Sequence, residues 1–246
     1  MKTMRNMSFV LLAMLVTGAA LWAAAAPPPA DTLPATGGNI TIAPLNHATL
    51  QLAWAGHVID VDPTPQANYT GLTAPDIILI TDIHGDHLSP PTITKIRKPT
   101  TKIVAPAAAA PQLENPIVMA NGETKTVDGI SIEAMPMYNL PKTGAQVPHE
   151  KGRGNGYIVT LGGKRIYIAG DTEGTPEMRA LKNIDVAFIP MNLPYTMPPA
   201  DAAVAVKAFH PAIVYPYHYR GQDVNIFAEA LKGTGIDVRL RDWYQQ

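Results

Sequence analysis

The hydrophobic pattern from residue 39 onwards consists of short apolar runs separated by turn residues. Such runs predict strands, which in the first half of the chain lie at 40–44, 49–53, 58–61, 76–80, 102–105, 117–120, 123–127 and 130–135. In the second half they lie at 156–161, 164–169, 186–190, 212–216 and 238–240. Helices are predicted at 91–98, 199–209 and 223–232. The pattern favours a strand-rich α/β protein with one long loop at 136–155.

The first 26 residues have the pattern of a secretory signal peptide. Two basic side chains, Lys2 and Arg5, precede an apolar run at 9–26. Cleavage after Ala25 would leave small residues on the amino side of the cut. The alternative is an uncleaved anchor, for which a run of roughly 18 residues is barely long enough. In both cases we expect export to the periplasm or the medium, and cleavage would leave no stable membrane span.

The mature part is expected to be a flexible lead-in at 27–38, rich in Pro, Ala and Gly, followed by one domain at 39–246. Apolar residues make up 46% of the sequence, which is enough for a sizeable core.

The formal net charge is −1 and no run of like charges occurs, so we expect no nucleic-acid partner. Cysteine is absent, which excludes disulfides and thiolate metal sites. Any metal must therefore be held by nitrogen and oxygen atoms.

Four candidate metal ligands follow the strand predicted at 76–80, and they are Asp82, His84, Asp86 and His87. In an extended segment the first two side chains point the same way and can reach one ion. The last two lie beyond a turn that a glycine permits and can serve a second ion. Imidazole and carboxylate groups suit divalent metals that keep a water molecule bound. The alternative is a charged turn whose side chains are solvated.

Two residues of the second half also stand just after predicted apolar strands: Asp171 and His218. Strand ends that face one edge of a sheet are where α/β proteins assemble their sites, so these residues are the natural partners of 82–87. His47 lies in a loop between the first two strands, and the pattern leaves open whether it belongs to the site or to the surface.

Several motifs are similar to those of a known family. They are TDIHGDH at 81–87, against the family pattern THxHxDH, GDT at 170–172, YPYH ending at His218, HAT at 47–49 and VDP at 61–63. From about residue 40 to its end, the chain resembles the metallo-β-lactamase-fold hydrolases. Within them it resembles the branch that includes ascorbate-phosphate lactonases and N-acylphosphatidylethanolamine phospholipases.

The resemblance implies a four-layer αβ/βα sandwich with a binuclear site at one edge. It also implies a metal-bound hydroxide as the nucleophile, which would hydrolyse an ester, lactone, amide or phosphodiester of a small molecule. Zinc is the metal of the family, with Mn or Fe as alternatives. By resemblance, one ion would be held by Asp82, His84, the bridging Asp171, and either Asn139 or His149. The other would be held by Asp86, His87, Asp171 and His218, with Asp86 also orienting the hydroxide.

Two departures from the family pattern affect the first ion. Asp82 replaces the first histidine, and the expected third histidine motif reads Met-Tyr-Asn at 137–139. Oxygen ligands shift the preference from zinc toward Mn, Mg or Fe, and a single-metal enzyme that fills only the second position is an alternative. The activity of a true β-lactamase is not expected, because it usually goes with the histidine-rich site that is missing here.

Candidates for substrate contact come from the loops, and they are His47, His149, Arg153, Asn155 and Tyr195. A guanidinium in a glycine-rich loop suits a carboxylate or phosphate, and the alternative for Arg153 is a solvated loop cation. Two rival functions remain open at this point. The chain could be an exported metal-binding or ligand-binding protein without turnover, or a structural domain that has kept the fold and lost the metal.

Overall fold

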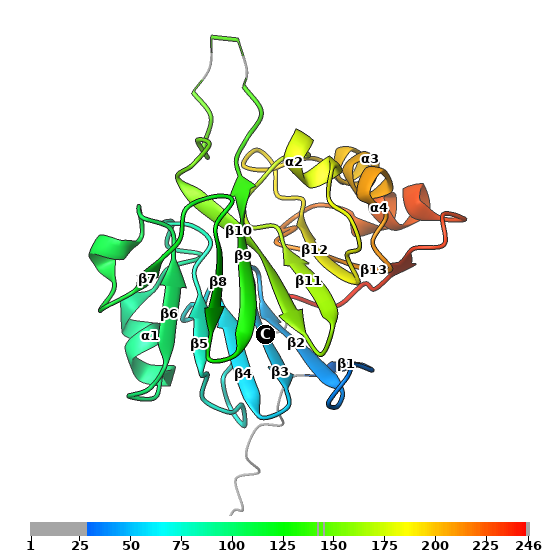
Figure 1. Ribbon diagram of the computed structural model, residues 1–246. Helices are drawn as coiled ribbons and strands as arrows, with labels where there is room; N and C mark the ends of the chain where they lie inside the picture. Colours follow the sequence, from blue (N-terminus) through cyan, green and yellow to red (C-terminus); the bar gives the residue numbers. More distant parts are fainter. Residues whose placement is uncertain (1–28, 142, 145, 245–246) are drawn as a thin grey trace, which may run out of the picture.

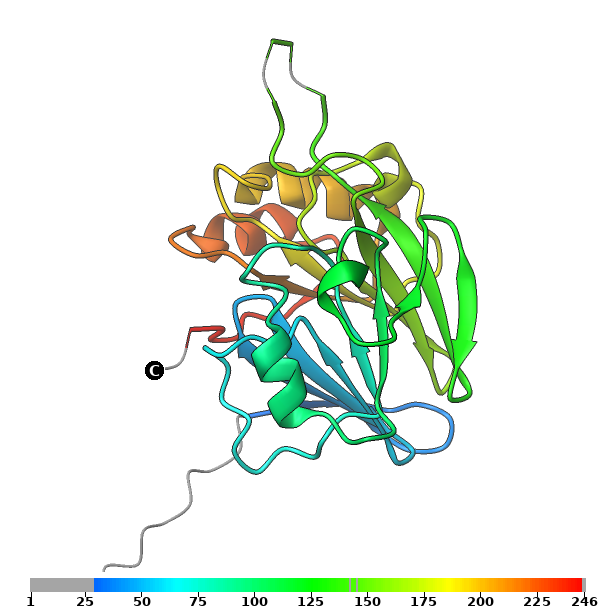
Figure 2. The ribbon, with the colours of Figure 1, turned by 90° about the vertical axis from the view of Figure 1, so that its left-hand side faces the viewer.

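The computed structural model describes residues 29–141, 143–144 and 146–244, so the expected signal peptide at 1–26 lies outside the described residues. Two seven-stranded mixed sheets pack face to face, and helices cover their outer faces (Figure 1, Figure 2). This gives four layers in the order helix, sheet, sheet, helix. The predicted αβ/βα sandwich is confirmed.

The first sheet contains the N-terminal strands in chain order. They are β1 (Asp31–Leu33), β2 (Ile40–Asn46), β3 (Thr49–Trp54), β4 (His57–Val61), β5 (Ile77–Leu79), β6 (Lys102–Ala105) and β7 (Ile117–Val118). Neighbours are antiparallel from β1 to β4 and parallel from β4 to β7. The carboxyl ends of β4 and β5 therefore share one edge, and the histidine-rich loop leaves the sheet there.

The second sheet contains the remaining strands, in reverse chain order from β14 to β8. They are β8 (Thr124–Val127), β9 (Ile130–Met137), β10 (Gly154–Leu161), β11 (Lys164–Ile168), β12 (Val186–Pro190), β13 (Ile213–Tyr217) and β14 (Asp237–Val238). Neighbours are antiparallel from β8 to β11 and parallel from β11 to β14. The carboxyl ends of β11 and β13 therefore also meet at one edge.

The helices are short and lie on the outer faces. They are α1 (Pro90–Ile96), α2 (Pro176–Arg179), α3 (Pro199–Phe209) and α4 (Val224–Leu231), with a 3-10 turn at Ala110–Gln112. Side-chain oxygens cap two of them, because Thr175 accepts a hydrogen bond from the Met178 amide and Asp223 accepts one from the Asn225 amide. None of the helices in the described part of the chain is long and apolar enough to span a membrane.

The main core lies between the two sheets because strand side chains alternate between two faces. In β10, Tyr157 and Val159 pack into this inner layer, whereas Ile158 packs against the helices of the outer layer. On the outer face of the first sheet, Ile93 of α1 packs against Ile78 and other strand residues. Burial on both faces explains why most central strands read as continuous apolar runs.

The predicted strands and helices all have counterparts in the structure, with ends that shift by a few residues. Two elements were not predicted, β1 and α2. The expected flexible lead-in at 27–38 is wrong for Asp31–Leu33, which pairs with β2. The Asp31 carboxylate anchors this strand, since it accepts hydrogen bonds from Tyr215 Oη at 2.7 Å and Arg241 Nη2 at 2.8 Å. Such long-range partners cannot be identified from a short polar segment.

Candidate metal centre

Loops from both sheets bring the candidate ligands to one edge of the sandwich. Residues 82–87 follow β5, His149 precedes β10, Asp171 follows β11, and His218 follows β13. The backbone joins the two halves here, because the His218 amide donates to the His47 carbonyl at 3.1 Å. The parallel order of the central strands therefore places side chains that are far apart in sequence around one point.

Three groups of ligand atoms form at this edge. Cluster A consists of Asp82, His84 and His149, and cluster B consists of His87, Asp171 and His218. In each group the ligand atoms lie within 4.8 Å of one another. Asp171 joins the two clusters, since its Oδ2 lies 3.3 Å from His87 Nε2 and 3.2 Å from His149 Nε2. Its other oxygen, Oδ1, lies 3.3 Å from His218 Nε2.

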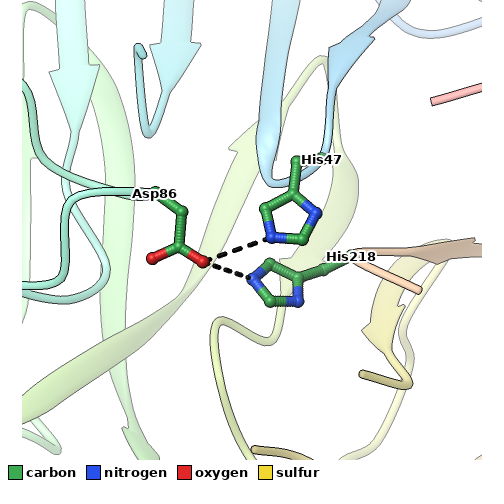
Figure 3. Close-up of side chains that lie close together, drawn as sticks. All are labelled: His47, Asp86 and His218. Atoms are coloured by element: carbon green, nitrogen blue, oxygen red, sulfur yellow. Dashed lines mark hydrogen bonds and ion pairs between the residues drawn. The ribbon is translucent and has the colours of Figure 1, made fainter. Parts of the chain in front are cut away.

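The third group extends cluster B toward solvent and contains His47, Asp86 and His218 (Figure 3). Asp86 Oδ2 lies 3.2 Å from His47 Nε2 and 3.5 Å from His218 Nε2. The two imidazole rings are close, with centroids 3.7 Å apart. His47 Nδ1 lies 2.7 Å from the Tyr244 hydroxyl, which fixes the ring from the opposite side. His47, which the sequence left open, thus borders the centre.

Several buried ligand atoms have no hydrogen-bond partner within the described residues. They are His87 Nε2, His149 Nε2, His218 Nε2 and Asp171 Oδ1. Buried polar atoms without partners are costly in folded proteins, and nitrogen and carboxylate oxygen are donors that divalent cations accept. The donor set therefore fits a divalent metal site.

Outer contacts orient two of the imidazoles. The Asp62 carboxylate accepts hydrogen bonds from His87 Nδ1 at 2.8 Å and from the Thr81 hydroxyl at 2.5 Å. Asn139 Oδ1 accepts hydrogen bonds from both the amide and Nδ1 of His149, at 2.8 and 2.9 Å. Because each Nδ1 is held from outside, each Nε2 faces the centre, which is the orientation that metal-binding histidines require.

The ionisation states also suit a cation. Burial raises the pKa of Asp171, but the electrostatic attraction of the neighbouring His218 and His87 imidazoles outweighs the effect of burial. The pKa of Asp171 therefore lies well below its ordinary value. Burial likewise raises the pKa of Asp86, but the adjacent imidazoles of His218 and His47 outweigh this effect and lower the pKa. Burial lowers the pKa of His47 to about 4. At neutral pH both carboxylates are ionised and His47 is uncharged.

A cavity of about 700 Å³ opens over the centre. Its floor carries ligand residues of the clusters, and its rim contains Pro148, Asn192, Leu193, Pro194, Tyr195 and Arg220. Tyr195 is 51% exposed and Leu193 is 44% exposed, so the rim presents apolar surface to solvent. Tyr195, which the sequence predicted as a substrate contact, lines this cavity.

The remaining predicted residues occupy other positions. Asn139 contacts His149 from behind and donates to the Tyr195 carbonyl at 2.8 Å, so His149 and not Asn139 faces the centre. Arg153 points to Asp82. The prediction of Asn155 as a substrate contact is wrong, because its buried amide donates to the Met119 carbonyl at 2.8 Å. It belongs to β10 and not to the predicted loop, which explains its inward position.

Sequence reasoning missed three residues of the site. Asp62 was visible only as part of the VDP motif, and its contact with His87 requires the fold. Arg220 follows the YPYH motif by two positions and lines the cavity. Tyr244 lies 197 residues from His47, and no local signal links the two.

Comparison with known proteins agrees with this geometry. Residues 41–218 match the family model described as the beta-lactamase superfamily domain. A UPF0173 metal-dependent hydrolase of Thermococcus onnurineus is 35% identical over 191 residues, which cover 71% of this chain and 82% of the relative. A related protein of Methanopyrus kandleri, also named a metal-dependent hydrolase, is 28% identical and covers 80% of this chain and 93% of that relative.

Solved structures give the same assignment. A protein from Parabacteroides distasonis that was assigned as a metal-dependent hydrolase is 44% identical, with a TM-score of 0.83 over 89% of this chain and 99% of that chain. Igni18, a metallo hydrolase from Ignicoccus hospitalis, shares the fold at 22% identity, with a TM-score of 0.68 over 82% of this chain and 94% of that chain. These names do not favour a binding protein without turnover. With its ligand clusters at the sheet edge, the chain therefore belongs to the beta-lactamase superfamily and is a metal-dependent hydrolase of the metallo-β-lactamase fold.

Proposed function

We propose that this protein hydrolyses an ester, lactone, amide or phosphodiester bond of a small molecule with two divalent cations. Cluster A, together with Asp171, would hold one cation. Cluster B, together with Asp86, would hold the other. The observation that carries the proposal is the convergence of buried, unpartnered nitrogen and oxygen atoms on one point at the floor of a large cavity.

Asp86 is the group best placed to handle the attacking water. Its side chain is 44% exposed, and the lowered pKa keeps it ionised. Oδ2 is directed at His47 and His218, so Oδ1 is left to accept a hydrogen bond from water in the cavity. Bound cations would polarise the scissile group and lower the pKa of a bound water molecule. The protein's own contribution is to orient that water.

The cavity rim supports a substrate with an apolar part and an anionic group. Leu193, Pro194 and Tyr195 form an apolar wall. Arg220 is the one Lys or Arg side chain among the described lining residues, and within them it has no carboxylate partner. A guanidinium in this position suits a carboxylate or phosphate of the substrate.

Matched ester pairs that differ only in a carboxylate test this preference. Arg220→Gln should raise KM about tenfold for the charged ester, because one charge-assisted hydrogen bond is lost, and should leave the neutral ester unchanged. The exposed residue Lys182 lies outside the cavity lining, and Lys182→Gln serves as the control. An equal effect of Arg220→Gln on both esters would contradict the proposed role.

Two further features are part of the proposal. The nitrogen and oxygen donors accept zinc, and the carboxylate in cluster A extends the choice to Mn or Fe. Export is proposed from residues 1–26 alone. Intact mass measurement of protein recovered from the exported fraction would test it, and a mass that still includes these residues would contradict cleavage.

The function itself is tested by hydrolysis of a panel of esters, lactones and phosphodiesters after chelation and metal return. Activity should vanish with chelation, return with Zn or Mn, and fall by at least about 100-fold in Asp171→Asn, because both cations lose a shared ligand. His57→Gln is the matched control, since this imidazole stacks on Trp54 outside the centre. Turnover that survives chelation, or that Asp171→Asn retains, would contradict the proposal.

A further inference from the structure

Asp82 stands where the resemblance expects a histidine, and the structure shows a second charge beside it. Arg153 Nε donates to Asp82 Oδ1 at 3.2 Å, and Nη2 donates to Oδ2 at 3.0 Å. Both carboxylate oxygens are therefore engaged by one guanidinium. The carboxylate is fully buried, and the Arg153 side chain is 22% exposed. Two parallel hydrogen bonds to a buried carboxylate form a strong and geometrically specific ion pair.

The guanidinium is also anchored from behind. Arg153 Nη1 donates to the Pro148 carbonyl at 2.8 Å, immediately before the cluster A ligand His149. The same Asp82 Oδ2 that accepts from Arg153 lies 2.8 Å from His84 Nδ1 and 3.8 Å from His149 Nε2. Arg153 thus holds the oxygen that faces cluster A and sets the position of the loop that carries His149.

Asp86, the corresponding carboxylate on the other side, is different. It faces His47 and His218, and no guanidinium or ammonium group of the described residues pairs with it. Cluster A with Asp171 contains two carboxylates, one of which is already neutralised by Arg153. Cluster B with Asp86 also contains two carboxylates, and neither is neutralised by a fixed cation. A divalent cation at cluster A would share Asp82 Oδ2 with a permanent positive charge, which opposes its binding.

We propose that Arg153 is the counter-ion of Asp82 and makes the two metal positions unequal. Cluster B with Asp86 binds the first equivalent tightly, and cluster A binds the second weakly and exchangeably. Arg153 is then a positioning residue that acts through Asp82, and not a substrate contact. This inference rests on the proposed metal centre and adds an order of filling to it.

The test is a metal titration of the full chain freed of metal with a chelator. Equilibrium dialysis against Mn²⁺, with bound metal measured by elemental mass spectrometry, should give one tight equivalent and a second whose Kd is on the order of 100-fold higher. In Arg153→Gln the second Kd should fall by at least about tenfold, while the first stays unchanged. Arg153→Lys keeps the positive charge and should retain the wild-type inequality.

The matched control is Arg165→Gln. Arg165 also forms a two-point contact with a carboxylate, since its Nη1 and Nη2 lie 2.6 and 3.5 Å from the oxygens of Glu133, but it lies near the opposite end of β11 from Asp171. This variant should leave both Kd values unchanged. If Arg153→Gln fails to fold because Asp82 is left unpaired, the double variant Asp82→Asn/Arg153→Gln removes both charges. It should bind one equivalent with the wild-type Kd.

Three results would overturn the inference alone. They are two equal sites in the wild type, an unchanged or weaker second site in Arg153→Gln, and a weakened first site in the double variant. Absence of any stoichiometric metal in the wild type would overturn both this inference and the proposed metal centre. Thermal unfolding of each variant without metal provides the check that the fold is retained.

Discussion

At the scale of single residues, the centre depends on side chains that do not face the cavity. Asp62 receives hydrogen bonds from three donors, which are the Thr81 amide, the Thr81 hydroxyl and His87 Nδ1. This arrangement fixes the orientation of the His87 ring and aims Nε2 at Asp171. Asn139 does the same for His149. Orientation by such contacts commonly contributes a large part of the affinity of a metal site.

Asp62→Asn should weaken metal binding by about 10–100-fold. The substitution replaces one carboxylate oxygen, which accepts hydrogen bonds, with an amide NH2 group, which can only donate them. The measurement is the Kd for Zn or Mn by calorimetric titration. Asp76→Asn is the matched control, since Asp76 pairs with Lys98 Nζ at 2.5 Å away from the centre. Equal affinities for Asp62→Asn and the wild type would show that His87 does not need this contact.

Asp60 gives a pH prediction that is independent of the metal. Burial raises its pKa to about 7, against a hydrogen bond from Gln51 that lowers it. The native state therefore keeps a proton on Asp60 that the unfolded state releases near pH 4. The free energy of unfolding consequently falls as pH rises from about 4 to 7, by at most about 4 kcal/mol. Asp60→Asn should unfold at a higher temperature than the wild type at pH 8 and lose most of this advantage at pH 5. Equal differences at both pH values would contradict the raised pKa.

At the scale of elements, the strands and helices were predictable because each is short, continuous and bounded by turn residues. The helix at Pro199–Phe209 matches its predicted range, since proline at its start and a left-handed His210 at its end define both limits. The four-residue helix α2 is too short for a periodic signal. Element ends next to the site were less predictable, and Asn155 was assigned to a loop although β10 begins at Gly154.

The turn after β11 shows how an element positions a ligand. Gly170 has φ +66°, and a Cβ atom there would lie 2.4 Å from Met137 Sδ. Gly170→Ala should lower the free energy of unfolding by about 2–4 kcal/mol, from backbone strain and overpacking, and should weaken metal binding by displacing Asp171.

Denaturant unfolding and metal titration would measure both effects of Gly170→Ala. Gly163→Ala is the matched control, because Gly163 has φ +81° but no atom within 4 Å of the position that an added Cβ would take, so only the strain of about 1–2 kcal/mol should remain. If Gly170→Ala lost no more stability than Gly163→Ala, the Met137 side chain would have to move aside without a cost in free energy.

At the scale of the whole molecule, the fold and most residues of the two clusters could be inferred from the sequence. Strand ends and motifs led to Asp171 and His218, which the parallel strands bring to one edge. The contacts of Arg153 with Asp82 and of Tyr244 with His47 could not be inferred, because they join segments 71 and 197 residues apart. The contacts that orient these side chains depend on tertiary packing, which the hydrophobic pattern of the sequence does not reveal.

The central claim is that divalent cations bind where the unpartnered atoms of the two clusters converge. The most direct measurement is an anomalous difference map from crystals of the protein grown with Zn or Mn. We predict a peak about 2.1 Å from His87 Nε2 and His218 Nε2 that also contacts Asp171, with a second, weaker peak at His84 and His149. A map without a peak between His87, Asp171 and His218, at saturating metal, would contradict the account.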